Sequence, residues 1–399
     1  MVTTKNLSSM EPMLPPDGVG RLEDLAFELA TKASGLASKL RPAVLQEIGD
    51  LVRSMNCYYS NLIEGHDTHP RDIDRALAYA DYSKDPKKRA LQLEAVAHIE
   101  IQRLIDHGED LRAETTSLDY LTWLHREFCR RLPEELLWVE NPDTGERLRV
   151  VPGELRKGWV QVGKHIPPDA DTLPGFLERF SRAYGSGGLS RVRRITALGA
   201  AHHRLLWIHP FYDGNGRVAR LMSHASLLRN GIGSSLWSVA RGLARNVQRY
   251  KLLLMAADGP RRGDLDGRGA LSAQALVDFC EFFLVTCIDQ VKFMDSLLDP
   301  DDLLRRMRLH VEEEIEARRL PRGAFPLLRE ALLAGEVARG QAGMITGYGE
   351  RMARNVVAEL LRQGYLKSRS PRSPLVLAFP IDAVERWFPR LYPGMTIFR

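Results

Sequence analysis

The chain has 399 residues, and its content of 27% charged and 44% hydrophobic residues is typical of a soluble globular protein. The length favours two or three domains, and no run of 18 apolar residues in the sequence predicts a membrane span. The formal net charge of +5 lies in residues 301–399, since the first 300 residues balance. This asymmetry favours a separate C-terminal module with an acidic partner.

The N-terminal segment, residues 1–20, is polar and contains several prolines. It has no apolar stretch of the kind found in secretory signals, so we expect a disordered segment. The four cysteines, Cys57, Cys129, Cys280 and Cys287, form no CxxC pair. We therefore expect reduced, mostly buried thiols in a cytoplasmic protein.

Residues 21–108 have a helical pattern throughout and predict an N-terminal helical region. One of its helices ends in SNLIEG, residues 60–65. Glu64 is unexpected there, because the C-terminal end of a helix already carries a partial negative charge. Such a residue suggests a basic partner elsewhere in the chain.

Residues 109–298 are predicted to form the main domain. Helical patterns cover about 118–132, 172–184, 191–208, 217–230, 240–257 and 272–298. Between the first two, residues 140–170 contain turn residues and short alternating segments. We expect a β-hairpin around 155–163.

The C-terminal part begins with a charged connecting helix at 299–321. The pattern of residues 322–399 is helix, helix, helix, hairpin, which is the order of a winged helix-turn-helix domain. Five basic residues would lie on its recognition helix and wing and would suit contacts to DNA phosphates: Arg351, Arg354, Lys367, Arg369 and Arg372. The alternative is a protein-docking or dimerisation module whose basic residues are merely solvated.

The stretch HPFYDGNGRVAR, residues 209–220, contains groups suited to proton transfer and phosphate binding. His209 has the side chain whose ordinary pKa suits a general base near neutral pH. Asp213 offers a carboxylate for Mg²⁺ or Mn²⁺. Residues 214–216, GNG, allow backbone N–H groups to converge on an anion.

Two arginines follow this loop at the start of a helix. Arg217 and Arg220 are three residues apart and therefore share one helix face. A helix N-terminus attracts phosphate, and two guanidinium groups add bidentate contacts. The stretch therefore predicts a nucleotide phosphate site beside a proton acceptor. The alternative, a transition-metal cluster of His202, His203, His209 and Asp213, is disfavoured because the arginines would repel a cation.

HPFYDGNGRVAR resembles the Fic motif, HPFxDGNGRxxR, at every defined position, and the resemblance extends over most of residues 20–300. It implies a mainly α fold, a Fic-type helical bundle with a small β-hairpin flap, here followed by the α+β winged helix-turn-helix domain. Fic adenylyltransferases transfer AMP from ATP to a hydroxyl of a target protein. The resemblance therefore implies ATP as co-substrate and Mg²⁺ or Mn²⁺ as cofactor.

The resemblance assigns roles by position. His209 would deprotonate the target's Ser, Thr or Tyr hydroxyl, Phe211 would hold the loop, and Asp213 would bind the metal ion. The ATP phosphates would contact Gly214, Asn215, Gly216 and Arg217, with the γ-phosphate on Arg220. Gly216 favours AMP transfer over phosphate transfer, because the kinase-like branch of the family has a lysine at this position.

Further positions follow the family less closely. The expected hairpin falls where the family has a flap that binds the target segment, so Lys157, Gly158 and Trp159 are candidates for its tip. Asn246 and Tyr250 fall where family members contact adenine. The family usually has two adjacent tyrosines there, whereas this chain has RYK at 249–251.

Ser60, Glu64 and Gly65 match the family's inhibitory pattern [S/T]xxxE[G/N], placed N-terminal to the core. The resemblance implies the N-terminally self-inhibited class, in which Glu64 would pair with Arg220 and occupy donors that the γ-phosphate needs. The alternative is an ordinary surface acid at a helix end.

Other functions remain open alongside a self-inhibited adenylyltransferase. The chain could be a DNA-binding transcriptional regulator that uses the Fic core as a nucleotide sensor, or an enzyme that also removes AMP. A homodimer is a further expectation, since Fic cores often dimerise.

Overall fold

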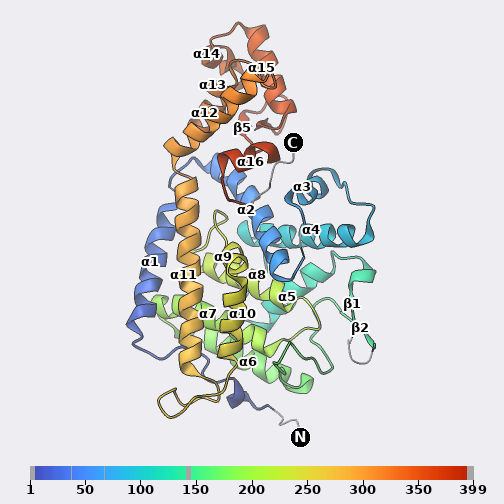
Figure 1. Ribbon diagram of the computed structural model, residues 1–399, viewed down its shortest axis with the longest axis vertical. Helices are drawn as coiled ribbons and strands as arrows, with labels where there is room; N and C mark the ends of the chain where they lie inside the picture. The colour runs from blue at the N-terminus through green and yellow to red at the C-terminus, as the bar shows by residue number, and fades with distance from the viewer. Residues whose placement is uncertain (1–4, 37, 67, 141–144, 393–399) are drawn as a thin grey trace. The chain divides into compact units, whose positions relative to one another are not determined.

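The computed structural model describes residues 5–36, 38–66, 68–140 and 145–392, and the fold is mainly α, as expected (Figure 1). The chain divides into two compact units. The first unit comprises Met1–Ala33, Asn56–Ser234 and Ser238–Gln290, and the second comprises Ser34–Met55, Ser235–Trp237 and Val291–Arg399. Two long helices, α2 and α11, are therefore shared between the units, and the last residues of α1 (Gly20–Leu36), from Ser34 on, also belong to the second unit.

The first unit is built almost entirely from helices. In chain order, with the two shared helices included, these are η1 (Leu7–Met10), α1 (Gly20–Leu36), α2 (Pro42–Ile63), α3 (Pro70–Tyr79), α4 (Pro86–Asp106), α5 (Leu118–Cys129), η2 (Glu134–Leu136), η3 (Ala170–Thr172), α6 (Leu173–Tyr184), η4 (Ser186–Gly188), α7 (Arg191–Ile208), α8 (Asn215–Arg229), α9 (Val239–Arg245), α10 (Val247–Ala257) and α11 (Ala273–Leu297).

Helices α7 and α8 form the centre of this unit. Helix α8 packs against α4, α5, α7 and α9 and is labelled in the middle of these helices in Figure 1. Both helices are buried along most of their length, as expected for helices enclosed on all sides. The bounds of α7 agree with the expected helix at 191–208. The turn between α7 and α8 carries residues 209–214 and is therefore held by the best-packed part of the unit.

The expectation of a disordered N-terminus is wrong for residues 5–19. Met10 and Met13 are fully buried, and the carbonyl oxygen of Pro12 accepts two hydrogen bonds from the buried guanidinium of Arg204. Two methionines and a buried arginine that needs acceptors order this segment despite its polar composition. Residues 1–4 lie outside the described part of the chain.

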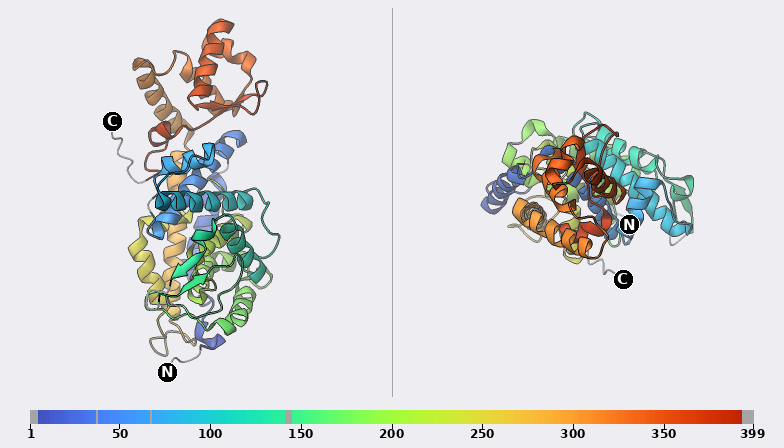
Figure 2. Two further views of the ribbon diagram at one scale, coloured as in Figure 1. Left: turned by 90° about the vertical axis from the view of Figure 1, so that its right-hand side faces the viewer. Right: turned by 90° about the horizontal axis from the view of Figure 1, so that it is seen from above.

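The β-hairpin does not lie where the sequence predicted it. Strands β1 (Trp138–Glu140) and β2 (Arg147–Arg149) pair antiparallel and are drawn as adjacent arrows in Figure 2. Residues 155–161 form no strand, and an isolated bridge joins Val162 to His165. The reason is Arg156, whose backbone N–H donates to Pro210 and whose side chain is buried. These bonds attach the segment to the α7–α8 turn, so it does not pair with itself.

The second unit contains a compact α+β module. Its further elements are α12 (Pro300–Glu316), α13 (Ala324–Ala334), β3 (Glu336–Val337), η5 (Arg339–Gln341), α14 (Ala342–Thr346), α15 (Glu350–Arg362), β4 (Leu366–Lys367), β5 (Leu375–Leu377) and α16 (Ile381–Trp387). The three strands form an antiparallel sheet in the order β3-β5-β4. Residues 393–399 lie outside the described part.

The first half of α2 belongs to this second unit. Val44, Ile48 and Val52 are fully buried, and Glu47 forms an ion pair with Lys367 of β4. The second unit is therefore discontinuous in sequence, and it includes residues far from the expected C-terminal module at 322–399.

The four cysteines are all buried and free, as expected. Within the described ranges, the structure contains no helix with the length and apolar character that crossing a membrane requires.

Candidate active site

His209 ends α7 in an unusual backbone conformation. Its φ of 50° is left-handed, and its N–H donates to the carbonyl oxygen of Leu205. Its own carbonyl oxygen accepts a 2.8 Å hydrogen bond from Nε of Arg156. Burial, together with the nearby Arg156 and His165, lowers the pKa of His209 to about 4. The imidazole is therefore neutral at neutral pH and free to accept a proton.

Two side chains hold the interior of the loop. Phe211 is fully buried and stacks on His125, with ring centroids 3.9 Å apart and planes inclined by 2°. The Asn215 amide donates to Phe211 O and accepts from Phe211 N. Gly214 has a φ of 79°, which favours glycine. Asn215 therefore stabilises the loop with its side chain, which leaves backbone N–H groups to meet an anion.

Arg220 is buried and contacts the SNLIEG segment. Its Nη2 lies 2.5 Å from Oε1 of Glu64 and also donates to Ser60 O, while its Nε donates to the Ser60 hydroxyl at 2.8 Å. The carboxylate thus makes one contact instead of the two-bond fork that we expected, and Ser60 accepts the other bonds. Gly216 leaves room for this contact, because a Cβ there would lie 2.3 Å from Glu64 Oε1 and would require that carboxylate to shift.

The ionisation of Glu64 follows from its surroundings. Burial opposes the charged form, but the Arg220 guanidinium outweighs this effect and lowers the pKa of Glu64 below its usual value. The pair is consequently ionised at neutral pH and would be lost only as acid protonates the carboxylate.

The other arginine of the motif also has an acidic partner. Nη2 of Arg217 lies 2.5 Å from Oε2 of Glu94, a residue of α4. His66 Nδ1 lies 3.3 Å from the same carboxylate oxygen. Sequence reasoning missed Glu94, because nothing in its helical pattern distinguishes it from a surface acid.

Asp213 is the only carboxylate of the motif, and its chemistry suits a divalent metal ion. Its side chain is 57% exposed, and its nearest basic group, Nη1 of Arg217, is 4.0 Å away. The described residues contain no cluster of three or more acidic, His or Cys ligands. One free carboxylate suits Mg²⁺, which takes most of its ligands from water and nucleotide phosphates. His202 and His203 are instead buried, bonded to Tyr250 and Asp258 respectively.

The proposed flap residues lie beside the motif even though they form no hairpin. Lys157 N donates to the Tyr212 hydroxyl at 3.3 Å, and a Cβ on Gly158 would lie 2.9 Å from that oxygen. Trp159 is 51% exposed. The residue that fixes them is Arg156, whose buried guanidinium also donates to Gly158 O and Pro168 O. Sequence reasoning missed it, because a buried arginine has no recognisable pattern.

The two residues proposed to contact adenine have different surroundings. Tyr250 is buried, and its hydroxyl lies 2.7 Å from Nε2 of His202. Asn246 is exposed, and its amide donates to Gly242 O. The two side chains thus differ in exposure and in hydrogen-bond partners.

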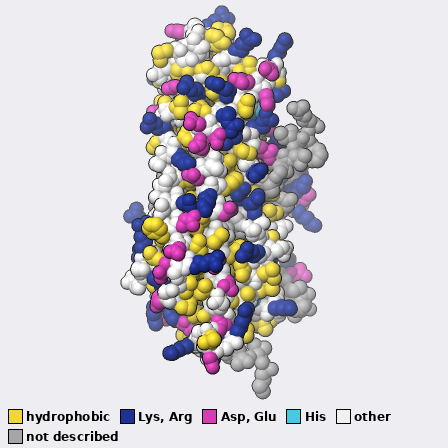
Figure 3. Space-filling view, turned by 60° about the vertical axis from the view of Figure 1, so that its left-hand side comes forward, with side chains coloured by type: hydrophobic (Ala, Val, Ile, Leu, Met, Phe, Trp, Pro, Cys, Tyr) yellow, Lys and Arg dark blue, Asp and Glu magenta, His cyan; other side chains and the backbone are white. Residues whose placement is uncertain are grey.

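The five basic residues of the C-terminal module are exposed. Arg354 pairs with Glu350 at 2.7 Å, and Lys367 pairs with Glu47. On the face drawn in Figure 3, acidic side chains lie among the basic ones. Arg351, Arg369 and Arg372 are thus the better candidates for contacts to an anionic partner.

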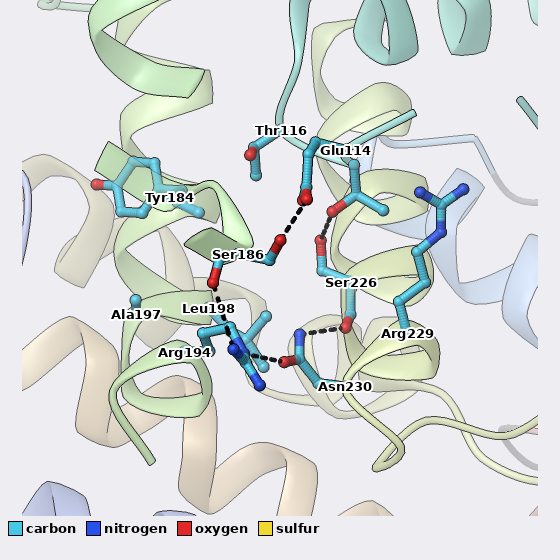
Figure 4. A pocket seen from close by; sticks show the side chains of 12 residues that line it. Glu114, Thr116, Tyr184, Ser186, Arg194, Ala197, Leu198, Ser226, Arg229 and Asn230 are labelled. Carbon is cyan, nitrogen blue, oxygen red and sulfur yellow. Dashed lines mark hydrogen bonds between the residues drawn. The ribbon is translucent and has the colours of Figure 1, made fainter. Parts of the chain in front are cut away.

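A separate pocket of about 200 Å³ lies at the opposite end of α8 (Figure 4). Most of its polar groups bond one another, including Glu114 with Ser186 and Arg194 with Asn230. It contains no residue of the motif, so the α7–α8 turn remains the candidate site.

The fold and the site define a helical protein with a neutral imidazole and two buried guanidinium groups around one turn between helices. Residues 114–227 match the Fic/DOC family. The chain also has a fold similar to that of a Fic family protein.

Known proteins show similarity of limited extent. The protein adenylyltransferase Fic of Drosophila erecta is 42% identical over 79 residues, which are 20% of this chain and 16% of the relative. The chain thus spans only a small part of the curated relatives it matches. A Fic family protein from Desulfovibrio desulfuricans has a TM-score of 0.53 at 18% identity, covering 92% of this chain and 98% of that one. Fic-1 of C. elegans (aa134–508) has a TM-score of 0.50 at 14% identity, covering 71% and 73%. At these identities the two structures show the fold alone.

Proposed function

We propose that this chain is a protein adenylyltransferase that transfers AMP from ATP to a Ser, Thr or Tyr hydroxyl of a target protein and of itself. The observation that carries this proposal is the α7–α8 turn, where the neutral His209 precedes two buried arginines in the first turns of α8. The Drosophila relatives have this activity in their name. The buried free thiols fit a reducing compartment such as the cytoplasm.

His209 acts as the general base in this mechanism. Its ring accepts the proton of the target hydroxyl as that oxygen attacks the α-phosphorus of ATP. The new bond joins the hydroxyl oxygen to phosphorus, the bond from phosphorus to the bridging oxygen breaks, and pyrophosphate leaves. The loop N–H groups, Arg217 and Arg220 orient the phosphates and balance their charge, which is the main requirement of phosphoryl-type transfer. Mg²⁺ held by Asp213 would neutralise phosphate charge.

Glu64 inhibits this reaction by occupying Arg220. Because Glu64 Oε1 lies 2.5 Å from Nη2 of Arg220, the γ-phosphate cannot use that donor until the carboxylate leaves. ATP then binds weakly, or with its α-phosphorus out of line for attack. Inhibition is thus a direct competition between two anions for one guanidinium.

Labelled ATP tests this proposal. Glu64→Gly should raise AMP incorporation by about tenfold or more, since a charge-assisted hydrogen bond contributes about 1.5–3 kcal/mol. His209→Ala should lower incorporation in that background by about a hundredfold or more. Glu109→Gly, which removes an exposed acid near the end of α4, is the matched control and should change nothing. Equal activity in all variants would overturn the proposal.

We also propose DNA binding by the second unit as a separate property. Its helices α13, α14 and α15 and its three-stranded sheet follow the order of a winged helix-turn-helix. Binding to duplex DNA should weaken steeply with salt and be lost on reversing Arg351 and Arg372 to Glu. Arg308→Glu on α12 is the control. Salt-independent binding, or none, would remove this property and leave the adenylyltransferase proposal untouched.

A further inference from the structure

Glu94 lies outside both the Fic motif and the SNLIEG segment, yet it contacts the motif directly. It is a residue of α4, which packs against α8. Its Oε2 accepts a 2.5 Å hydrogen bond from Nη2 of Arg217. Both side chains are largely removed from solvent, with 13% of Glu94 and 5% of Arg217 exposed.

We propose that Glu94 is a second inhibitory carboxylate, which competes with nucleotide phosphate for Arg217 as Glu64 does for Arg220. The inference rests on the proposed function, because it takes the α7–α8 turn to be the site of the ATP phosphates. It adds a residue and a second arginine to the regulation of that site.

The ion pair with Glu94 does not give every hydrogen-bond donor of Arg217 a partner. In a purely structural arginine, all buried donors would be paired. Its Nε is buried and has no hydrogen-bond partner among the described residues. Its Nη1 is 4.0 Å from Asp213, which is longer than a hydrogen bond. Buried polar groups in native proteins nearly always have a hydrogen-bond partner. The guanidinium thus retains donors for a ligand while Glu94 occupies one of its positions.

The charges in the site support the same conclusion. Glu64 and Glu94 each place a carboxylate against one arginine, and Asp213 lies 4.0 Å from Arg217. Nucleotide phosphates are strongly anionic, and their attraction to a buried site depends on its net positive charge. Replacing either glutamate by a neutral side chain makes the surroundings of the two guanidinium groups more positive. Each removal should therefore strengthen phosphate binding.

The two carboxylates come from different elements and contact different arginines. Glu64 directly follows α2, whereas Glu94 lies in the middle of α4. His66 adds a contact to the Glu94 carboxylate at 3.3 Å. The hydrogen bond between Glu94 and Arg217 joins α4 to α8 and includes no residue of the SNLIEG segment, although His66, the next residue along the chain, contacts both side chains. Full access to the phosphate site requires both pairs to open.

Affinity for Mg²⁺–ATP tests the inference without depending on transfer. All variants carry His209→Ala, so that ATP is not consumed, and binding is measured by calorimetry. Glu94→Gln keeps the shape of the side chain and removes its charge. It should tighten binding by about tenfold, the effect of one uncompensated charge in a partly buried site. Glu64→Gln should tighten binding too, and the double variant should bind more tightly than either single variant.

The matched control is Asp106→Asn. Asp106 lies on the same helix and contacts His224 of α8 at 2.6 Å, away from the motif, so its loss should leave ATP affinity unchanged. If Glu94→Gln does not fold, Glu94→Asp withdraws the carboxylate by one methylene and should tighten binding to a smaller degree.

The outcomes separate this inference from the proposed function. Weaker ATP binding by Glu94→Gln would make Glu94 a residue that orients Arg217 for phosphate, and unchanged binding would make the pair structural. Either result overturns the inference. If Glu64→Gln tightens binding and Glu94→Gln does not, the proposed function stands alone. If no variant binds Mg²⁺–ATP, both are wrong.

Discussion

His209 shows how packing prepares a single residue for its reaction. Burial disfavours the imidazolium, and the neighbouring Arg156 and His165 disfavour it further, so the pKa of His209 falls to about 4. A histidine of ordinary pKa would be partly protonated between pH 6 and 7. The depressed pKa keeps the base in its active form across that range.

This predicts a distinctive pH profile. In Glu64→Gly, where the inhibitory carboxylate no longer titrates, kcat/KM for AMP transfer should stay flat from pH 8 down to about 5. It should fall only as pH approaches about 4, because the imidazole is then protonated. Circular dichroism at each pH checks that the protein remains folded. An acid limb centred near the ordinary histidine pKa would contradict the prediction.

At the scale of elements, a buried arginine fixes the loop around Lys157, which has no regular secondary structure. Arg156 donates to carbonyl oxygens of His209, Gly158 and Pro168. Those bonds take the place of a β-ladder and hold the segment with the exposed Trp159 beside the α7–α8 turn.

Arg156→Leu should therefore release this loop. Loss of several hydrogen bonds from a charged donor to buried carbonyl oxygens should lower the free energy of unfolding by about 3 kcal/mol. Hydrogen exchange of residues 155–168 should accelerate, and thermal unfolding should shift downward. Lys157→Ala, at an exposed neighbour, should change the unfolding free energy by less than about 0.5 kcal/mol. Similar behaviour of the two variants would refute the anchoring role.

At the scale of the whole molecule, the division into units does not follow the order of the chain. The second unit contains residues 34–55 as well as 291–399. Arg41 donates to Leu333 O, and Glu47 pairs with Lys367. The C-terminal module thus completes the surroundings of the first half of α2.

Removal of residues 322–399 should accordingly expose the N-terminal part of α2, residues 42–55. Amide exchange at residues 44–52 should become markedly faster, because Arg41 and Glu47 lose their partners Leu333 and Lys367. The central helix α7 of the first unit should keep its protection and serves as the internal control. Unchanged exchange at 44–52 would show that the module is independent of α2.

The sequence by itself determined the helices and the chemistry of the α7–α8 turn. Helical periodicity is a local property, and it predicted α7 within its observed bounds. His209, Asp213, the glycines and both arginines lie within twelve residues, so local chain geometry alone brings them together. Short alternating segments gave a weaker signal, which is why the hairpin was expected at 155–163 instead of 138–149.

Only the tertiary structure decided which distant side chains complete the site. Arg156 reaches the carbonyl oxygen of a residue 53 positions away, and Glu94 reaches Arg217 across 123 positions. A buried ion pair forms only where two elements pack closely enough to exclude water, and no single segment specifies that proximity. The same packing placed Ser60 and Glu64 on Arg220, at a glycine with no side chain to block them.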